Sequence, residues 1–521
     1  MNQPRVITAF RCLAVLLLVP TSVASAQQGG QDRLAVLLPP MLEPTPEFPP
    51  AASSQQPAKA AGKPSGSSPG VAYTAPALGS AHKALSINLA TALSMTDARA
   101  IDIALAAERV QTAAAQLARA RALWLPTLYV GTDYYRHDGT IQDMSGNIVD
   151  ANKQSFMAGV GPAAVFNFSD ALFAPLAARQ ALRANQAGRQ TATNNSMLAV
   201  AEAYFTVQQA RGELAGAEDT VGRAQALVGR TEKLAPGLVP SLEITRARTE
   251  LSRRRQSIQL ARERWGTAGA ELARLLRLDA AALVEPMEPP QLQVTLVNLD
   301  RSVDELIPIA LTNRPELGSQ QALVQVSLQL LRQERMRPLL PSLLVRGSST
   351  PVTGTLAAGV YGGGVGGALG NFGMRQDWDV QLVWALENMG FGNKARIREQ
   401  AANNRAALLQ LYRAQDQVAA DVVTAFTRAQ TATARAKEAE QELKSALESV
   451  EQNLAGVEQT KRAGEVIILV VRPAEVVAAV QALALAYTDY YGAVADANRA
   501  QFRLYWALGR PGGDLLTAAT H

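Results

Sequence analysis

Alternating apolar and polar residues predict four extended segments in the middle of the chain. Apolar side chains occupy the even positions from Trp378 to Leu386, and polar side chains fill the first odd positions of that run. A second run, from Phe156 to Phe168, places phenylalanine, alanine or valine at most even positions. Such period-two alternation predicts strands with one apolar face. Residues 127–137 and 342–350 alternate less regularly and are predicted to be the partner strands.

Long proline-free stretches follow each pair of strands and predict unusually long helices. No proline occurs between Pro175 and Pro236, or between Pro351 and Pro473. At 1.5 Å per residue, about 60–70 helical residues would reach roughly 90–100 Å. Each long helix is expected to end in a turn, at 236–241 and at 462–465, and to be followed by a returning helix of nearly 40 residues.

The same order of elements occurs twice along the chain. Helices predicted at 97–123 and 303–336 each end at a proline and lead into a pair of strands. Loops are expected between the paired strands, at 138–152 and at 351–375, and glycine-rich 359–373 is interpreted as a flexible loop. The predicted organisation is a signal peptide at 1–26, a Pro/Ala/Ser-rich disordered leader at 27–88, a first repeat at 89–285, a linker at 286–302, a second repeat at 303–512 and a tail at 513–521.

The N-terminal segment has the layout of a secretory signal peptide. Arg5 and Arg11 precede a short apolar core, and a small-residue site predicts cleavage after Ala26. The only cysteine, Cys12, lies inside this segment, so the mature chain is expected to have no thiol chemistry. The leader is interpreted as a tether, and a peptidoglycan-binding role for it stays open.

Composition narrows the class of protein further. Hydrophobic residues make up 48% of the chain but aromatics only 5%, which indicates long alanine-rich helices rather than bulky cores. The net charge of +5 has no concentrated basic face, so nucleic acid is not an expected partner. The three mature histidines, His82, His137 and His521, are too scattered to suggest a metal site, and no constellation indicates an enzyme or a cofactor.

Four strands are too few to enclose a membrane channel, because small closed barrels need at least about eight. The chain is therefore expected to oligomerise, and three copies would supply twelve strands. Trp378 and Trp384 would then lie on the outward face, roughly 20 Å apart at about 3.3 Å per residue, as a membrane girdle. A soluble antiparallel sheet with one buried face is the alternative interpretation.

Several short motifs, in order and at matching spacing in both halves, resemble the TolC family of outer-membrane efflux proteins. They are Trp124-Leu125-Pro126-Thr127-Leu128, Gly237-Leu238-Val239, Asn313-Arg314-Pro315-Glu316-Leu317, Pro338-Leu339-Leu340-Pro341-Ser342-Leu343, Arg462-Ala463-Gly464, and the stretch from Tyr490-Tyr491-Gly492 to Leu508-Gly509. The resemblance implies a mainly α fold with a membrane β-barrel contribution: a homotrimer that forms a 12-stranded β-barrel in outer-membrane lipid and an α-barrel in the periplasm. It also implies two partners, a periplasmic adaptor protein and an inner-membrane pump.

The resemblance also assigns roles to the two helix tips. The adaptor is expected to dock on Gly237, Leu238, Val239, Ser241, Ala463 and Gly464. Family members often narrow the periplasmic end with aspartates after the second tip, but this chain has Val470 and Pro473 there. An apolar constriction at Leu469 and Val470, with Glu243 as its acidic contribution, is therefore expected. For the apolar run 466–471, helix packing or adaptor contact remains an alternative to a pore-facing role.

A second class of function stays open from the residues alone. The chain would then be a periplasmic helical scaffold whose strands form only a soluble β-subdomain. Under the interpretation that the family resemblance implies, the chain is a passive export duct of a tripartite efflux or type I secretion system. The exported cargo (drug, metal ion or protein) is not determined by these residues.

Overall fold

The computed structural model describes residues 84–234, 238–279, 282–347, 358–365, 368–463 and 466–509. The predicted signal peptide, almost all of the predicted leader and the C-terminal tail therefore lie outside the described residues, as do Gly237 and Gly464. The leader prediction is wrong at its end, because Ala84–Ile87 forms strand β1 and pairs in parallel with β6, Leu283–Pro286.

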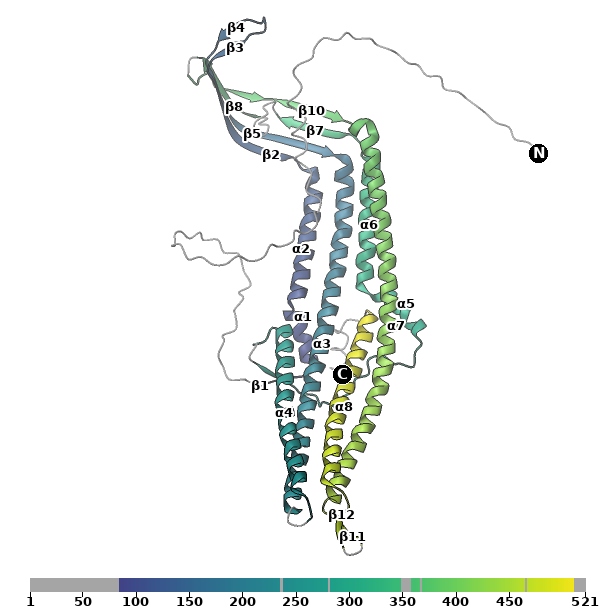
Figure 1. The fold of residues 1–521 in the computed structure, drawn as a ribbon. Coiled ribbons are helices and arrows are strands. Elements are labelled where there is room, and N and C mark those ends of the chain that lie inside the picture. Colours follow the sequence, from purple (N-terminus) through teal and green to yellow (C-terminus); the bar gives the residue numbers. More distant parts are fainter. Residues whose placement is uncertain are drawn as a thin grey trace, which may run out of the picture. The chain divides into compact units, whose positions relative to one another are not determined.

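The helices follow the predicted order of short helix, long helix and return helix in both halves (Figure 1). The first half contains α1 (Leu89–Arg99), α2 (Ile101–Arg121), the 3-10 turn η2 (Ala122–Trp124), α3 (Phe168–Leu234) and α4 (Ser241–Leu276); the second contains α5 (Val303–Asn313), α6 (Pro315–Met336), the turn η3 (Glu387–Gly390), α7 (Phe391–Gly456) and α8 (Pro473–Ala507). The long helices α3 and α7 have 67 and 66 residues, which confirms the interpretation of the proline-free stretches.

Both predicted helices that precede the strands are broken. The second breaks at Arg314, which is extended (φ −68°, ψ 118°), because the ring of Pro315 disfavours helical geometry in the residue before it. The first begins at Leu89 rather than near Asp97 and breaks at Ala100 (φ −64°, ψ 126°), where no proline follows.

The strands form an antiparallel sheet with four strand positions. β5 (Lys153–Asn167) pairs with β2 (Thr127–His137) on one side, and on its other side with β7 (Ser342–Gly347) and then β8 (Ala358–Val365). β10 (Trp378–Val383) pairs with β7, and β9 (Gly373–Gln376) pairs with β8. β7 and β8 thus share one position, and β9 and β10 share the next.

The interpretation of the glycine-rich stretch as a flexible loop is wrong for part of its length. Residues 358–365 form β8, and a β-carbon at Gly359 would overlap the carbonyl oxygen of Ala158 on β5. Glycine is needed there for close strand approach rather than for a mobile loop. The other predicted loop, at 138–152, contains a small hairpin of β3 (Thr140–Gln142) and β4 (Ile148–Asp150).

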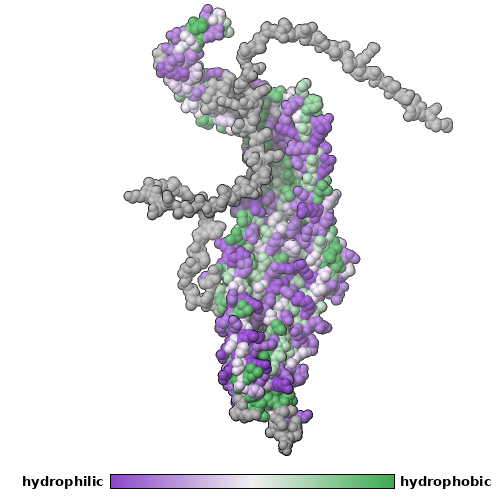
Figure 2. Space-filling model, in the orientation of Figure 1, coloured by the Kyte–Doolittle hydropathy of each residue, from purple (hydrophilic) through white to green (hydrophobic). Residues whose placement is uncertain are grey.

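Small side chains make the helix contacts. In the pairing of α7 with α8, Ala429, Ala436 and Ala493 are at most 3% exposed. A second buried cluster joins α3 and α4 to α1 and to β1 and β6, and a third lies near the tips of α3, α4, α7 and α8. Alanine allows close packing without bulky side chains, which explains how a chain with few aromatics forms a core. Figure 2 shows polar residues over much of the helical part, with smaller apolar patches between them.

Candidate functional sites: a sheet face and two helix tips

One face of the sheet is apolar across all four strand positions. Strand pairing aligns Leu382 with Leu343 and Phe166, and Val380 with Val345 and Ala164. On the far side of β5, Val130 lies opposite Val160. These side chains share one face, which we call the apolar face; its members are Leu128, Val130, Val160, Ala164, Phe166, Leu343, Val345, Trp378, Val380 and Leu382.

Many side chains of the apolar face are exposed. Val130 is 77% exposed, Val380 65% and Trp378 64%, and Trp384 just beyond β10 is 57% exposed. A contiguous apolar surface of this kind marks contact with a membrane or with another protein. The two tryptophans singled out from the alternation both have exposed side chains, and their girdle role stays a prediction.

The opposite face of the sheet is polar on β9 and β10, whereas Val165 of β5 and Leu344 of β7 lie on it side by side. Arg375 forms an ion pair with Asp377 at 2.7 Å and lies over the ring of Tyr361, 5.6 Å from its centroid. Asp379 and Gln381 follow on the same face, and a Gln381 amide hydrogen bonds to the Asp379 carboxylate at 3.1 Å. At β9 and β10 the sheet therefore separates an apolar side from a polar side.

Both outer edges of the sheet lack a partner among the described residues. β2 pairs with β5 alone, and β9 and β10 pair only with β8 and β7. An unpaired strand edge presents a row of backbone donors and acceptors that a further chain can take up.

The first tip joins α3 to α4. Leu238 donates its backbone N–H to the carbonyl of Leu234 at 3.2 Å and is 37% exposed. Ser241 is exposed, but Val239 is only 7% exposed, so its side chain supports the tip from inside. Of the predicted docking residues at this tip, Leu238 and Ser241 are the ones whose described side chains a partner could reach.

The second tip is a β-hairpin and not the predicted simple turn between helices. β11 (Thr460–Ala463) pairs with β12 (Val466–Leu469), and Val470 donates its N–H to the carbonyl of Gln459 at 2.9 Å. Residues 466–469 are therefore a strand and not part of a helix. Leu469 is half-buried and Val470 is 51% exposed, whereas Ala463 is described only in its backbone.

Glu243 is less available as an acidic pore group than its position suggests. Its side chain is 15% exposed and forms an ion pair at 2.7 Å with Arg246, one turn along α4. The partner charge offsets much of the field that the carboxylate would project.

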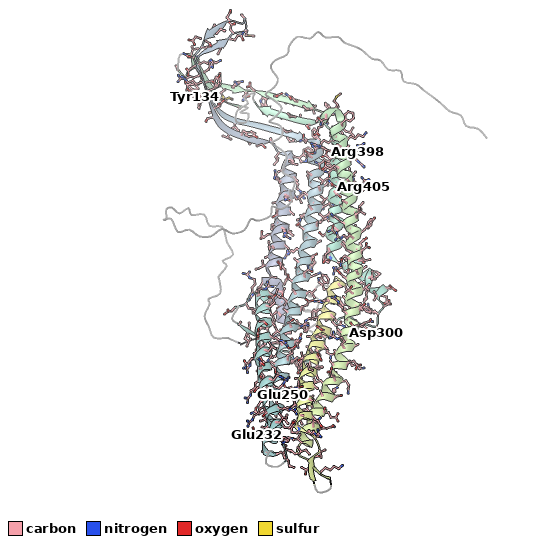
Figure 3. All side chains as sticks on the ribbon, viewed as in Figure 1. Tyr134, Glu232, Glu250, Asp300, Arg398 and Arg405 are labelled. Carbon is pink, nitrogen blue, oxygen red and sulfur yellow. The ribbon has the colours of Figure 1, made fainter. Side chains whose placement is uncertain are left out.

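Ion pairs missed by sequence reasoning tie the helix pairs together near the tips. Arg230 of α3 donates to the carbonyl of Leu454 and lies 3.2 Å from the Glu458 carboxylate. Glu250, labelled in Figure 3, is buried on α4, pairs with Arg254 at 2.7 Å and accepts from Gln481 of α8 at 2.8 Å. The Glu250–Arg254 spacing of four was visible in the sequence, but the burial and the contact with α8 were not.

Two glycines let α3 and α8 approach each other. Gly212 lies against the ring of Tyr491 and Gly216 against Tyr487, and these two rings stack with centroids 6.2 Å apart. The Tyr487 hydroxyl donates to the Asp219 carboxylate at 3.1 Å. Burial, reinforced by the charge of Asp219, raises the pKa of Tyr487 to about 12.

The raised pKa of Tyr487 predicts a loss of stability at alkaline pH. The folded chain holds this proton more tightly than the unfolded chain, so the stabilisation is complete below pH 10 and is lost as pH rises toward 12. Thermal unfolding of the purified protein between pH 9 and 12 measures this. The Tyr487→Phe variant should be less stable at neutral pH, because it loses the hydrogen bond to Asp219. Its stability should, however, fall less steeply than that of the unaltered protein as the pH rises. Parallel curves for the two proteins would contradict the assignment.

Within the part of the chain that the structure describes, no group of three or more histidine, cysteine or acidic side chains is placed to hold a metal ion. Nor is any described helix both long and apolar enough to cross a membrane.

Comparison with known proteins agrees with this geometry. A family model described as outer membrane efflux protein matches residues 92–276. No curated protein matches the sequence. The fold is similar to the outer membrane protein VceC of Vibrio cholerae (16% identity, TM-score 0.64, 81% of this chain and 96% of that one) and to the MtrE outer membrane channel of Neisseria gonorrhoeae in its open state (16%, 0.64, 81% and 89%). The CmeC outer membrane channel of Campylobacter jejuni is also similar (15%, 0.64, 81% and 85%).

Proposed function

We propose, from the premise that this chain is a TolC-family outer membrane efflux protein, that it is the passive export duct of a tripartite efflux or type I secretion system. It acts in the outer membrane and extends into the periplasm. The observation that carries the proposal is the sheet: it has one exposed apolar face, polar side chains on the other face of β9 and β10, and two edges that are unpaired among the described residues, and long helices lead away from it.

The duct requires several copies of the chain. Each chain supplies four strand positions. Two copies would make an eight-stranded barrel, and side chains fill the interior of a barrel of that size. Three copies would make a twelve-stranded barrel wide enough for a channel, closed through the free edges of β2 and of β9 and β10. The apolar face would lie against outer-membrane lipid with Trp378 and Trp384 as its girdle, and the helices would form the periplasmic α-barrel.

The mass of the detergent-solubilised protein tests this assembly. Multi-angle light scattering should give about three protomers after subtraction of the detergent. The alternative function, a periplasmic scaffold with a soluble β-subdomain, requires recovery from the periplasm without detergent. A monomer with full β content, or a dimer, would contradict the duct.

A periplasmic adaptor is the proposed partner of the two tips, and an inner-membrane pump would supply the energy and the cargo. Leu238 and Ser241 are exposed at the first tip, and the docking surface would also include Gly237, Ala463 and Gly464. Replacing Gly237 or Gly464 by leucine should reduce export at least severalfold in a cell-based efflux assay, because close approach of the adaptor needs small residues. Trimer mass should stay unchanged. Normal export by both variants would remove these residues from the docking surface.

The periplasmic end would be closed by an apolar constriction at Leu469 and Val470. Apolar narrow passages resist hydrated ions by dewetting, and Glu243 adds little because Arg246 neutralises it. In planar bilayers, Val470→Asp should raise single-channel conductance severalfold and increase cation selectivity. Glu243→Gln is the control and should change either quantity only slightly. Strong cation selectivity of the unaltered protein, unchanged by Val470→Asp, would place the gate elsewhere.

A further inference from the structure

Exposed apolar side chains continue from the sheet to the start of α7 and are followed at once by cations. Leu386 is 64% exposed, Met389 90% and Phe391 75%. Lys394 and Arg398, both exposed, come within the next two turns of α7. The order along the chain is therefore apolar surface first, positive charge second.

The cations lie on one side of α7. Arg398 is four residues after Lys394, and Arg405 is seven after Arg398, and both spacings return to the same helix face. At 1.5 Å per residue, Lys394 lies about 4.5 Å beyond Phe391, Arg398 about 10 Å and Arg405 about 21 Å. Figure 3 places Arg398 and Arg405 on the outer edge of this half of α7.

These cations differ from their neighbours in having no acidic partner. Arg396 pairs with Glu387 at 3.0 Å, and Arg337 pairs with Asp170 at 2.7 Å. Among the ion pairs of the described residues, none includes Lys394 or Arg398. Residues 391–409 contain four cations and a single carboxylate, Glu399, so this surface carries surplus positive charge.

Two other helices place cations next to exposed apolar residues where they meet the sheet, with the order along the chain reversed. On α2, exposed Arg119 and Arg121 precede Leu125, which is 70% exposed. On α6, exposed Arg332 and Arg335 precede Leu339, which is 67% exposed. We call Lys394, Arg398 and these four arginines the junction cations.

We propose that the junction cations of α7 bind anionic phospholipid headgroups in the periplasmic leaflet, a proposal that rests on the proposed membrane placement of the sheet. The headgroup layer of one leaflet is about 5–8 Å thick. Lys394 lies within that depth beyond Phe391, and Arg398 reaches it with its long side chain, as such residues do at membrane surfaces. Arg405 lies beyond it. Cations within one or two turns of exposed Phe391 favour lipid over peptidoglycan, which would be met farther from the apolar surface.

Bromolipid quenching of tryptophan fluorescence tests the proposal in the full-length protein. Trp378 and Trp384 lie where acyl chains would contact them. The protein is reconstituted in vesicles that mix brominated phosphatidylglycerol or brominated phosphatidylcholine with unbrominated lipid. The two quenching curves give the relative affinity of the annulus for the anionic lipid. Because each cation near a membrane surface favours anionic lipid by up to about fivefold, the double variant Lys394→Gln/Arg398→Gln should lose most of the preference on this side.

The controls separate this proposal from the function on which it rests. Arg405→Gln, on the same face but farther from the sheet, should keep the preference, and so should Arg398→Lys. High salt should weaken it in the unaltered protein through screening. Full quenching by phosphatidylcholine with no anionic preference, or a preference unchanged in the double variant, would overturn the headgroup site and leave the membrane placement standing. Absence of quenching by either lipid would overturn the membrane placement and this proposal together.

Discussion

Val380→Arg should almost abolish assembly in the outer membrane. Val380 lies midway along β10 on the apolar face, 65% exposed, and its cross-strand neighbours are Val345 and, beyond it, Ala164. An arginine on the lipid side costs about 2–4 kcal/mol near the bilayer centre. Three arginines in one trimer would cost about three times this free energy, which is comparable to the whole stability of a typical folded protein.

The neighbouring residue supplies the matched control. Gln381 is on the opposite, polar face of the same strand, so Gln381→Arg adds the same charge on the side that would face water. The amount of trimer in outer-membrane fractions, separated on semi-native gels, should fall at least tenfold for Val380→Arg and stay near the original level for Gln381→Arg. Equal yields for the two variants would mean that the apolar face does not contact lipid.

Gly216→Leu should cause a large loss of stability. A β-carbon at Gly216 would lie 2.6 Å from Cγ and 2.7 Å from Cβ of Tyr487, closer than real β-carbons approach such atoms. Because Tyr487 also bonds to Asp219 and stacks on Tyr491, it has little freedom to move aside. Overpacking of this kind costs typically about 1–3 kcal/mol per chain.

A glycine six residues along the same helix gives the opposite expectation. Nothing lies within 4 Å of a β-carbon built at Gly222, and glycine inside a helix is destabilising relative to other residues by about 0.5–1 kcal/mol. Gly222→Leu should therefore raise the thermal midpoint slightly, whereas Gly216→Leu lowers it by several degrees. Midpoints that shift in the same direction would show that α3 and α8 do not pack as closely as described.

Much of the architecture followed from local patterns. Proline-free stretches predicted the long helices, because proline lacks an N–H and clashes with the preceding turn; the return helix α8 begins at Pro473. Period-two alternation located the core of β5 and β10, and 127–137, predicted as a partner strand, has the observed bounds of β2. The same order of helix, strand pair, long helix and return helix occurs twice, and this repetition revealed the two halves.

The glycine stretch and the second tip were decided by contacts that no local pattern contains. Glycine at 359 was interpreted as loop, yet its backbone pairs with β5, nearly 200 residues earlier in the chain. The second tip is a hairpin because residues 460–463 pair with 466–469, where a simple turn between helices was expected.

The sequence by itself determined the two long helices, the positions of β2, β5, β7 and β10, the apolar face of β10, and the family that the ordered motifs resemble. Only the tertiary structure decided which side chains meet. It buried Glu250 beside Gln481, set Gly216 against Tyr487, neutralised Glu243 with Arg246, and left Lys394 and Arg398 without acidic partners beside an open apolar surface. The physical reason is that propensity and periodicity act over a few residues, whereas burial and ion pairing depend on surfaces brought together from distant parts of the chain.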